Sequence, residues 1–160
     1  MLKSITQLLA RRQTPAKAPH LELGARGERV AVEYLKREAG YRIVATNFVI
    51  PLGRGMKNQR VDGEIDIIAY DGETLVFVEV KTRTSDEVAS PERAVDLRKQ
   101  RQIARAARRS RRMMKVTDES YRYDVLTVMP EGAEFRIQLL PGYFSDSVFR
   151  RSRYYNSFSG

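Results

Sequence analysis

Two apolar segments joined by four polar residues are the feature that most constrains the fold. Residues 64–70 (EIDIIAY) and 75–83 (LVFVEVKTR) are rich in β-branched and aromatic residues, which favour β-strands. Residues 71–74 (DGET) between them have the composition of a tight turn. The sequence therefore predicts an antiparallel β-hairpin whose strands carry acidic side chains among apolar ones.

Side-chain alternation along the hairpin brings two of these acids together. If Tyr70 faces Leu75 across the turn, Asp66 faces Glu79 on the neighbouring strand. Directly opposed Cβ atoms in an antiparallel pair are roughly 4.5–5.5 Å apart, and like charges at that spacing are destabilising. Two carboxylates placed in this way need a counter-charge.

The same register places Glu64 opposite Lys81. Lys81 follows Glu79 by two positions and therefore shares its strand face. An isolated Glu-x-Lys on a solvated strand is usually an ordinary ion pair, and this simpler interpretation stays open at this point.

A third acid is expected from a helix near the N-terminus. Residues 21–39 have apolar and small residues at helical spacing, and Gly40 follows as a stop signal. The stripe that faces the core consists of Leu21, Gly24, Glu28, Ala31 and Leu35. A buried Glu28 carboxylate needs a cationic partner, which is either a metal ion or an arginine.

The residues that the chain lacks narrow the chemistry further. It has no cysteine and a single histidine, His20, which excludes thiolate zinc sites, His–Cys nucleases and Ser–His triads. Carboxylates from Asp66, Glu79 and Glu28 suit a hard divalent cation, Mg²⁺ or Mn²⁺. Such an ion would polarise a phosphodiester and activate water, with Lys81 orienting that water or stabilising the developing charge.

The rest of the pattern predicts a sheet of about five strands flanked by helices, of the α/β or α+β class. Further strands are expected at residues 41–50, 121–129 and 134–141, a loop at 51–62, and a long helix at 93–115.

The domain boundaries follow from composition. We expect a flexible N-terminal tail at residues 1–20, one domain at 21–141, and a basic, aromatic extension at 142–160. No segment has the pattern of a signal peptide or a membrane span, so we expect a cytoplasmic protein.

An excess of basic residues favours a polyanionic partner. Lys and Arg total 29 against 20 for Asp and Glu, a formal net charge of +9. The long helix is expected to carry one basic stripe, formed by Arg98, Arg101, Arg105, Arg108, Arg112 and Lys115. Solvated helix faces usually include acids, and this helix has none after Asp96, so we interpret the stripe as a phosphate-binding face.

Other basic and aromatic residues extend this hypothesis. They are Arg54, Lys57 and Arg60 in the expected loop, and Arg150, Arg151, Arg153, Tyr154 and Tyr155 near the C-terminus. The two tyrosines stack on unpaired bases or, the alternative we favour, pack a terminal helix against the core.

Three ordered motifs resemble a known family. They are G-x-x-G-E at residues 24–28, GEIDIIA at 63–69 and FVEVKTR at 77–83, and Lys99-Gln100 and RYDV at 122–125 continue the match. The combination resembles the YraN-like family of inferred endonucleases, within the restriction-endonuclease-like PD-(D/E)xK superfamily and similar to Holliday-junction resolvases. The resemblance covers about residues 22–128.

The resemblance implies a restriction-endonuclease-like mixed β-sheet of about five strands flanked by helices. It implies that Asp66 and Glu79 are metal ligands, that Lys81 is the catalytic lysine, and that Glu28 is a helix carboxylate near the metal. It implies second-line roles for Glu64 and Lys99. The basic loop at 51–62 and both tails depart from the family pattern.

The leading hypothesis is therefore a metal-dependent endonuclease that hydrolyses phosphodiester bonds in DNA, including branched or structured DNA. One alternative is a non-catalytic nucleic-acid-binding module with the same fold. Another is an RNA- or ribosome-associated basic protein whose acids are structural. A homodimer is compatible with nuclease chemistry, because cutting both strands of a duplex needs two sites.

Overall fold

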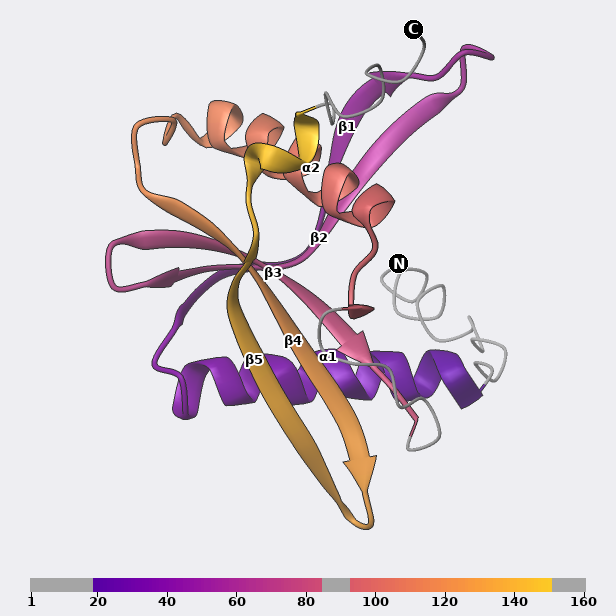
Figure 1. Cartoon of the computed structure of the whole chain (residues 1–160), viewed down its shortest axis with the longest axis vertical. Coiled ribbons are helices and arrows are strands. Elements are labelled where there is room, and N and C mark those ends of the chain that lie inside the picture. The colour runs from indigo at the N-terminus through magenta and orange to yellow at the C-terminus, as the bar shows by residue number, and fades with distance from the viewer. Residues whose placement is uncertain (1–18, 85–92, 151–160) are drawn as a thin grey trace, which may run out of the picture.

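The computed structural model describes residues 19–84 and 93–150. In chain order the elements are α1 (Pro19–Arg37), β1 (Arg42–Arg54), β2 (Arg60–Asp71), β3 (Thr74–Thr82), α2 (Leu97–Met114), β4 (Tyr121–Glu131), β5 (Glu134–Phe144) and the 3-10 helix η2 (Asp146–Phe149). Figure 1 shows the strands as a strongly twisted sheet with α1 and α2 on opposite sides. The predicted tail at residues 1–20 falls outside the described part up to residue 18, and His20 lies in the first turn of α1.

The five strands form one mixed sheet in the order β1-β2-β3-β4-β5. Three of the pairings are antiparallel, and β3 and β4 are parallel. Antiparallel neighbours are joined by short turns, whereas parallel neighbours need a crossover connection, and α2 lies in that connection. The predicted α/β sheet of about five strands with flanking helices is confirmed.

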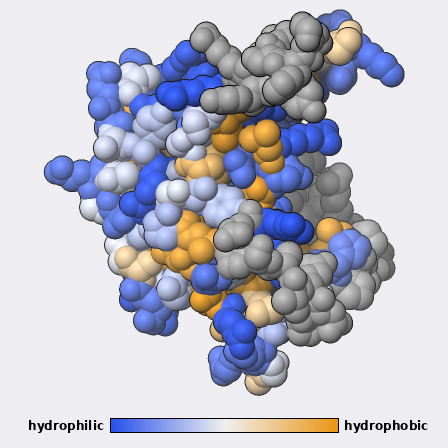
Figure 2. Space-filling view, in the orientation of Figure 1, coloured by the Kyte–Doolittle hydropathy of each residue, from blue (hydrophilic) through white to orange (hydrophobic). Residues whose placement is uncertain are grey.

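Each face of the sheet has its own apolar core. On one side α1 contributes Ala31 and Leu35, both fully buried, against Val76, Val78 and other side chains of the sheet. On the other side α2 contributes a row of small residues around Ile103, which pack on Phe77 and its neighbours. In Figure 2, hydrophilic residues cover the outer parts of the visible face, and apolar residues gather along its middle.

Local signals set the ends of the helices. Asp96 caps α2, its side chain accepting a hydrogen bond from the backbone N–H of Lys99 at 2.8 Å, and Lys115 ends the helix with a φ of 59°. After α1 the chain turns at Gly40, which has a φ of 73°. Positive φ values cost a residue without a Cβ little. Because Asp96 caps α2, the helix begins at Leu97 and is shorter at its start than the helix predicted for residues 93–115.

The loop predicted for residues 51–62 is wrong, because β1 and β2 continue through most of it as a hairpin. Pro51 pairs with Asp62, and after a register shift Arg54 pairs with Arg60. Proline is tolerated here because β1 is an edge strand: it has a neighbouring strand on one side only, so the missing N–H of Pro51 need not interrupt hydrogen bonding to another strand. Because Pro and Gly were interpreted as loop residues, the predicted lengths of both strands were too short.

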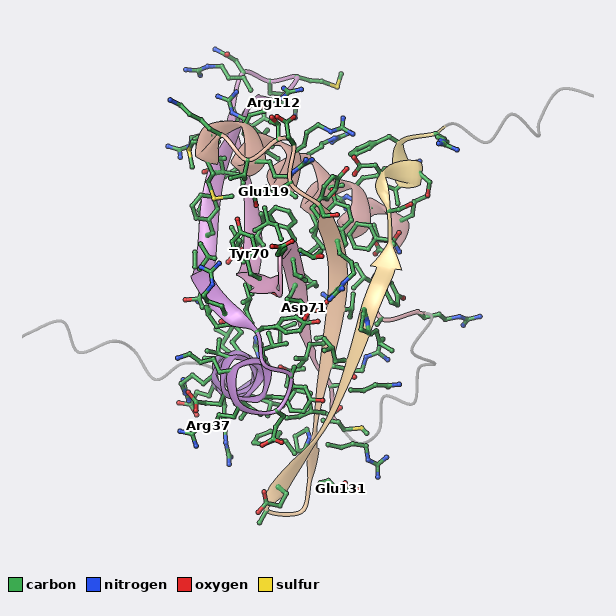
Figure 3. All side chains as sticks on the ribbon, turned by 90° about the vertical axis from the view of Figure 1, so that its left-hand side faces the viewer. Arg37, Tyr70, Asp71, Arg112, Glu119 and Glu131 are labelled. Carbon is green, nitrogen blue, oxygen red and sulfur yellow. The ribbon has the colours of Figure 1, made fainter. Side chains whose placement is uncertain are left out.

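A buried polar network fixes the junction of α1 and β1 to the centre of the sheet. Asp124, fully buried in β4, accepts hydrogen bonds from the Tyr41 hydroxyl (2.9 Å), from Arg122 Nε (2.8 Å) and from the backbone N–H of Gly142 (2.9 Å). Arg122 also contacts Asp71 at 2.9 Å. Asp71 and Tyr70 lie near the middle of the molecule in Figure 3, where the Tyr70 hydroxyl donates to Glu119 at 2.5 Å.

The chain beyond β5 packs back on α2. Asp146 in η2 accepts hydrogen bonds from the hydroxyls of Tyr121 and Tyr123, each at 2.8 Å. Val148 is buried in the core on the α2 side. Part of the extension predicted at 142–160 thus belongs to the packed structure, while Arg151, Arg153, Tyr154 and Tyr155 lie outside the described residues.

Neither within residues 19–84 nor within 93–150 is there a helix of sufficient length and apolar character to cross a bilayer.

Candidate active site

The candidate site begins where β2 and β3 separate. Their ladder contains the predicted pair Tyr70–Leu75 and ends at Ile67–Val78. One residue beyond, Asp66 Oδ2 accepts a hydrogen bond from the backbone N–H of Val80 at 2.8 Å. The Asp66 carboxylate therefore replaces a strand carbonyl as the partner of this N–H, and Asp66–Glu79 is not a ladder pair.

Glu79 is the buried centre of the site. Its side chain is only 3% exposed, and its Oε1 lies 3.1 Å from Lys81 Nζ and 3.3 Å from Lys99 Nζ. Both lysine side chains are about one-third exposed, so their charged ends reach solvent. Within the described residues Glu79 Oε2 has no hydrogen-bond partner although it is buried. A buried carboxylate oxygen without a donor is costly unless a further group meets it.

α1 approaches the end of β3 closely at one glycine. A Cβ on Gly27 would lie 2.0 Å from Thr82 Oγ1, so a larger residue fits only if the Thr82 side chain or the helix moves. Glu28, the next residue, is half-buried, and its negative charge acts on Asp66. The sequence resemblance singled out this glycine, and the structure supplies the reason in the contact with Thr82.

The environment of Asp66 disfavours its charged form. Burial, with a further contribution from the Glu79 carboxylate, raises the pKa of Asp66 to about 7, while the hydrogen bond from Val80 and the charge of Lys99 act in the opposite direction. Strongly perturbed carboxyl groups with a defined charge partner are characteristic of functional sites. Asp66 and Glu79 are therefore coupled electrostatically across the separating strands.

The expectation that only a bound cation balances these acids needs correction. Among residues 19–84 and 93–150 no three carboxylate or histidine side chains form a ready-made metal-binding group. Two lysines contact Glu79 and a backbone N–H donates to Asp66, so groups of the protein supply part of the balance that the sequence analysis assigned to a cation alone. Burial raises the pKa of Asp66, and Glu28 acts on this centre through its charge, which raises that pKa further.

Glu64 is exposed on β2. The alternation of side chains between the two faces of the sheet, on which its predicted position depended, does not continue from Tyr70 as far as Glu64. Ile65 and Ile68 both belong to the core on the α2 side, although alternation would place them on opposite faces. The change of orientation falls at Asp66, where the facing strand contains Asn47 with a φ of 49° between the pairs Thr46–Ile67 and Phe48–Ile65. The predicted pairing of Glu64 with Lys81 therefore does not follow from the observed geometry.

The residues of the predicted basic stripe of α2 differ in their surroundings. Arg101 is partly buried and donates to the Val148 carbonyl at 2.8 Å, and Arg108 pairs with Asp146 at 3.3 Å while its guanidinium covers the Phe149 ring. These two arginines hold η2 in place. The exposed members of the stripe are Arg98, Arg105, Arg108, Arg112 and Lys115, and Arg109, which the stripe omitted, is exposed as well.

Sequence reasoning missed the backbone N–H of Val80, because a main-chain group leaves no signature in the residue type. It also reached Lys99 only through the resemblance. The contact between Lys99 and Glu79 joins α2 to β3, and no local pattern reveals it.

A mixed sheet with an aspartate on one central strand and Glu-x-Lys on the next defines the restriction-endonuclease-like class of α/β proteins. Within this class the chain can be placed more narrowly. The model of a family described as "Uncharacterised protein family UPF0102" matches residues 27–128, well over half of the chain. The chain belongs to this family, the YraN family that the sequence motifs resemble.

Curated relatives agree with this assignment. A UPF0102 protein of Geobacter metallireducens is 43% identical over 122 residues, covering 76% of this chain and 91% of the relative. A UPF0102 protein of Bacteroides thetaiotaomicron is 38% identical over 132 residues, covering 82% and 99%.

Among solved structures, one titled "Crystal structure of SSO0001" aligns with a TM-score of 0.40 at 14% identity. The alignment covers 80% of this chain and 55% of that chain. The strand order and pairing of the present protein, rather than this likeness, define its fold.

Proposed function

We propose that this protein is a metal-dependent endonuclease that hydrolyses phosphodiester bonds in DNA. The observation that carries the proposal is the arrangement around Glu79: a buried carboxylate with one oxygen facing two lysines and the other without a partner in the described residues. Asp66, with its raised pKa, lies on the adjoining strand. Neighbouring titratable groups whose environments give them different pKa values are typical of acid–base and metal-assisted hydrolysis.

The donor set fits a hard cation. Asp66 and Glu79 offer carboxylate oxygens, and the chain contains no cysteine and no histidine except His20. Mg²⁺ and Mn²⁺ prefer oxygen ligands, and the unpartnered Glu79 Oε2 is an oxygen that such an ion would satisfy. Asp66 and Glu79 would hold the ion, with Glu28 adding negative charge nearby. Once bound, it supplies Lewis-acid activation of the scissile phosphate and the attacking water.

The two lysines supply positive charge to the phosphate. The Lys81 and Lys99 ammonium groups reach solvent from the Glu79 side, so both can contact a phosphate oxygen that enters the site. Charge that develops on the phosphate during attack is stabilised by donors already in position, which need no reorganisation. Glu79 fixes both lysines, because its Oε1 contacts the two amines together.

A polyanionic substrate is supported by the overall charge of +9 and by the exposed basic residues of α2. DNA is the substrate that the family resemblance implies. Each phosphate contact releases counterions, so we expect binding to weaken steeply as salt concentration rises.

A second candidate is a DNA-binding module that does not cut. One observation favours it: Lys81 and Lys99 already balance Glu79, so this carboxylate does not require a metal. Under this alternative Mn²⁺ binds no more tightly to the native protein than to a variant without Asp66.

The test is a cleavage assay on duplex, single-stranded and four-way-junction DNA with Mg²⁺, Mn²⁺ or EDTA. We expect cutting with either metal, none in EDTA, and none by Asp66→Ala or Glu79→Ala, while both variants bind DNA at least as well as the native protein. Cutting that survives both substitutions, or that persists in EDTA, would refute the proposed function.

A further inference from the structure

The hairpin of β1 and β2 projects beyond the rest of the sheet as an arm formed by residues 53–61. It passes α2 at Gly63, where an added Cβ would lie 2.8 Å from Ala106 Cβ and 3.0 Å from the Leu52 side chain. This close contact fixes the base of the arm to the helix. In Figure 3 Arg112 of α2 lies at one end of the long axis, opposite Glu131 in the β4–β5 turn, and Figure 1 shows the hairpin of β1 and β2 at the same end as α2.

Hydrogen bonds hold the tip of the arm in one shape. The N–H of Gly55 donates to the Gln59 carbonyl at 2.8 Å, and the N–H of Asn58 donates to the Gly55 carbonyl at 2.9 Å. Arg54 donates to the Asn58 carbonyl at 3.0 Å, and the Gln59 side chain accepts from the N–H of Lys57 at 3.0 Å. The side chains at the turn are therefore presented by an ordered scaffold.

The tip presents one large apolar side chain among positive charges. Met56 is fully exposed, with a relative accessibility of 104%, and Lys57 beside it is exposed. Residues 53–61 contain three basic residues and no acid, and because Arg60 pairs with Asp62 at 2.6 Å, Lys57 is the basic residue at the tip that we assign to DNA. A single exposed apolar side chain is common on protein surfaces, so the signal here is its combination with basic side chains on an ordered, projecting turn.

We propose that this arm enters the minor groove of duplex DNA, with Lys57 on the phosphate backbone and Met56 against a base step. The proposal rests on the proposed function, because it assigns the arm a place on the same substrate. Two-stranded β-ribbons of DNA-binding proteins lie in the major or the minor groove, and methionine is among the apolar residues that minor-groove proteins insert between base steps. Basic side chains beside it position the ribbon without reading sequence.

The geometry gives the place of contact. Arg60, where the turn joins β2, and Asp66 are six positions apart, so at ~3.3 Å per residue the strand between them spans about 20 Å, and Lys57 at the tip lies farther out. If the arm lies along the duplex, ~3.4 Å per base pair gives at least about six base pairs between Lys57 and the scissile phosphate.

Binding measurements separate the two contacts. In EDTA we expect Lys57→Gln to weaken duplex binding and to reduce the salt slope by about one, and Met56→Ser to weaken binding several-fold with the slope unchanged. Lys36→Gln, an equal loss of charge on the exposed side of α1, is the matched control and leaves both quantities unchanged. Thermal unfolding checks that all three variants fold.

The absence of cysteine allows the contact to be mapped. A DNA-cleaving iron chelate attached to Lys57→Cys should cut the duplex at least about six base pairs from the site of enzymatic hydrolysis. The same attachment at Lys36→Cys should give no localised cutting.

Three results would overturn the arm proposal: arm variants that bind duplex DNA like the Lys36 control, diffuse cutting from the chelate, or equally arm-dependent binding of duplex RNA, whose groove dimensions differ. Arm-dependent DNA binding by a protein that never cuts supports the arm and refutes the proposed nuclease. DNA cleavage that the arm variants leave unchanged supports the proposed nuclease and refutes the role of the arm.

Discussion

Asp66 Oδ2 accepts a hydrogen bond from the backbone N–H of Val80 at 2.8 Å, across the point where β2 and β3 cease to pair. The carboxylate thereby joins two strands whose ladder has ended at Ile67–Val78 and sets the position of the residues that follow in β3. Among these are Lys81 and Thr82, which contact Glu79 and Gly27 respectively. Asp66 therefore has a structural role besides any catalytic one.

The two roles of Asp66 separate in a pair of variants. Asp66→Asn keeps an oxygen acceptor for Val80, whereas Asp66→Ala leaves that N–H without its partner, at a cost of about 1–3 kcal/mol. In EDTA at pH 8 we expect Asp66→Asn to be more stable than Asp66→Ala by this amount, measured by urea unfolding. Equal stability of the two variants would show that the hydrogen bond contributes nothing.

The raised pKa of Asp66 also predicts a pH dependence. Folding raises this pKa from about 3.9 to about 7. Between about pH 4 and pH 7 the folded protein keeps a proton that the unfolded chain has released, so this carboxyl group makes stability fall as pH rises through that window. The free energy of unfolding of Asp66→Asn should therefore exceed that of the native protein by roughly 2–4 kcal/mol at pH 8, and most of this difference should disappear at pH 4.5. A constant difference between the two pH values would contradict this account.

Metal affinity tests the role of Glu79. Because loss of outer-shell groups alone weakens metal sites roughly 10–100-fold, we expect Glu79→Gln to weaken Mn²⁺ binding by at least about tenfold in calorimetry. Glu38→Gln, an exposed site at the end of α1, provides the control. Unchanged affinity in Glu79→Gln would place the ion elsewhere.

The two lysines should compete with the metal for Glu79. Removing either charge leaves Glu79 Oε1 less compensated, so Lys99→Gln and Lys81→Gln should each bind Mn²⁺ several-fold more tightly. Both variants should nevertheless lose cleavage rate, with the larger loss in Lys81→Gln. Weaker Mn²⁺ binding in both would mean that the lysines support the site rather than compete for it.

The approach of α1 to β3 can be tested with two glycines of one helix. Gly27→Ala should cost about 1–3 kcal/mol, because the new Cβ overlaps Thr82 Oγ1. Gly24→Ala meets no atom within 4 Å and should stabilise α1 by about 0.5–1 kcal/mol. Thr82→Ala should restore part of the loss in Gly27→Ala. A loss at Gly27 that Thr82→Ala does not relieve would contradict the overlap.

Much of the fold could be predicted because its strong signals are local. The Asp71–Thr74 turn and the alternation on both sides of it specify the Tyr70–Leu75 register. Asp96 and the Gly-free run after it indicate α2. The arm escaped prediction because Pro51 and Gly53 have loop composition, whereas the edge position of β1 tolerates them in a strand.

The site was only partly predictable for a different reason. Asp66, Glu79 and Lys81 lie on neighbouring strands, so the period of two and the turn bring them close. The charge balance depends on Lys99 from a distant helix, and the position of Asp66 depends on a backbone N–H. Neither contact has a local pattern, and the resulting neutralisation of Glu79 by two lysines was therefore not anticipated.

The parallel pairing of β3 and β4 has a consequence for the order in which the site is completed. Parallel neighbours require the chain to return across the sheet, and α2, with Lys99 in its first turn, belongs to that return. A growing chain that has made β3 already has both acids and Lys81 but not the second ammonium group. The last cation arrives only when the crossover has docked, so closing the sheet and balancing its central carboxylate are one event.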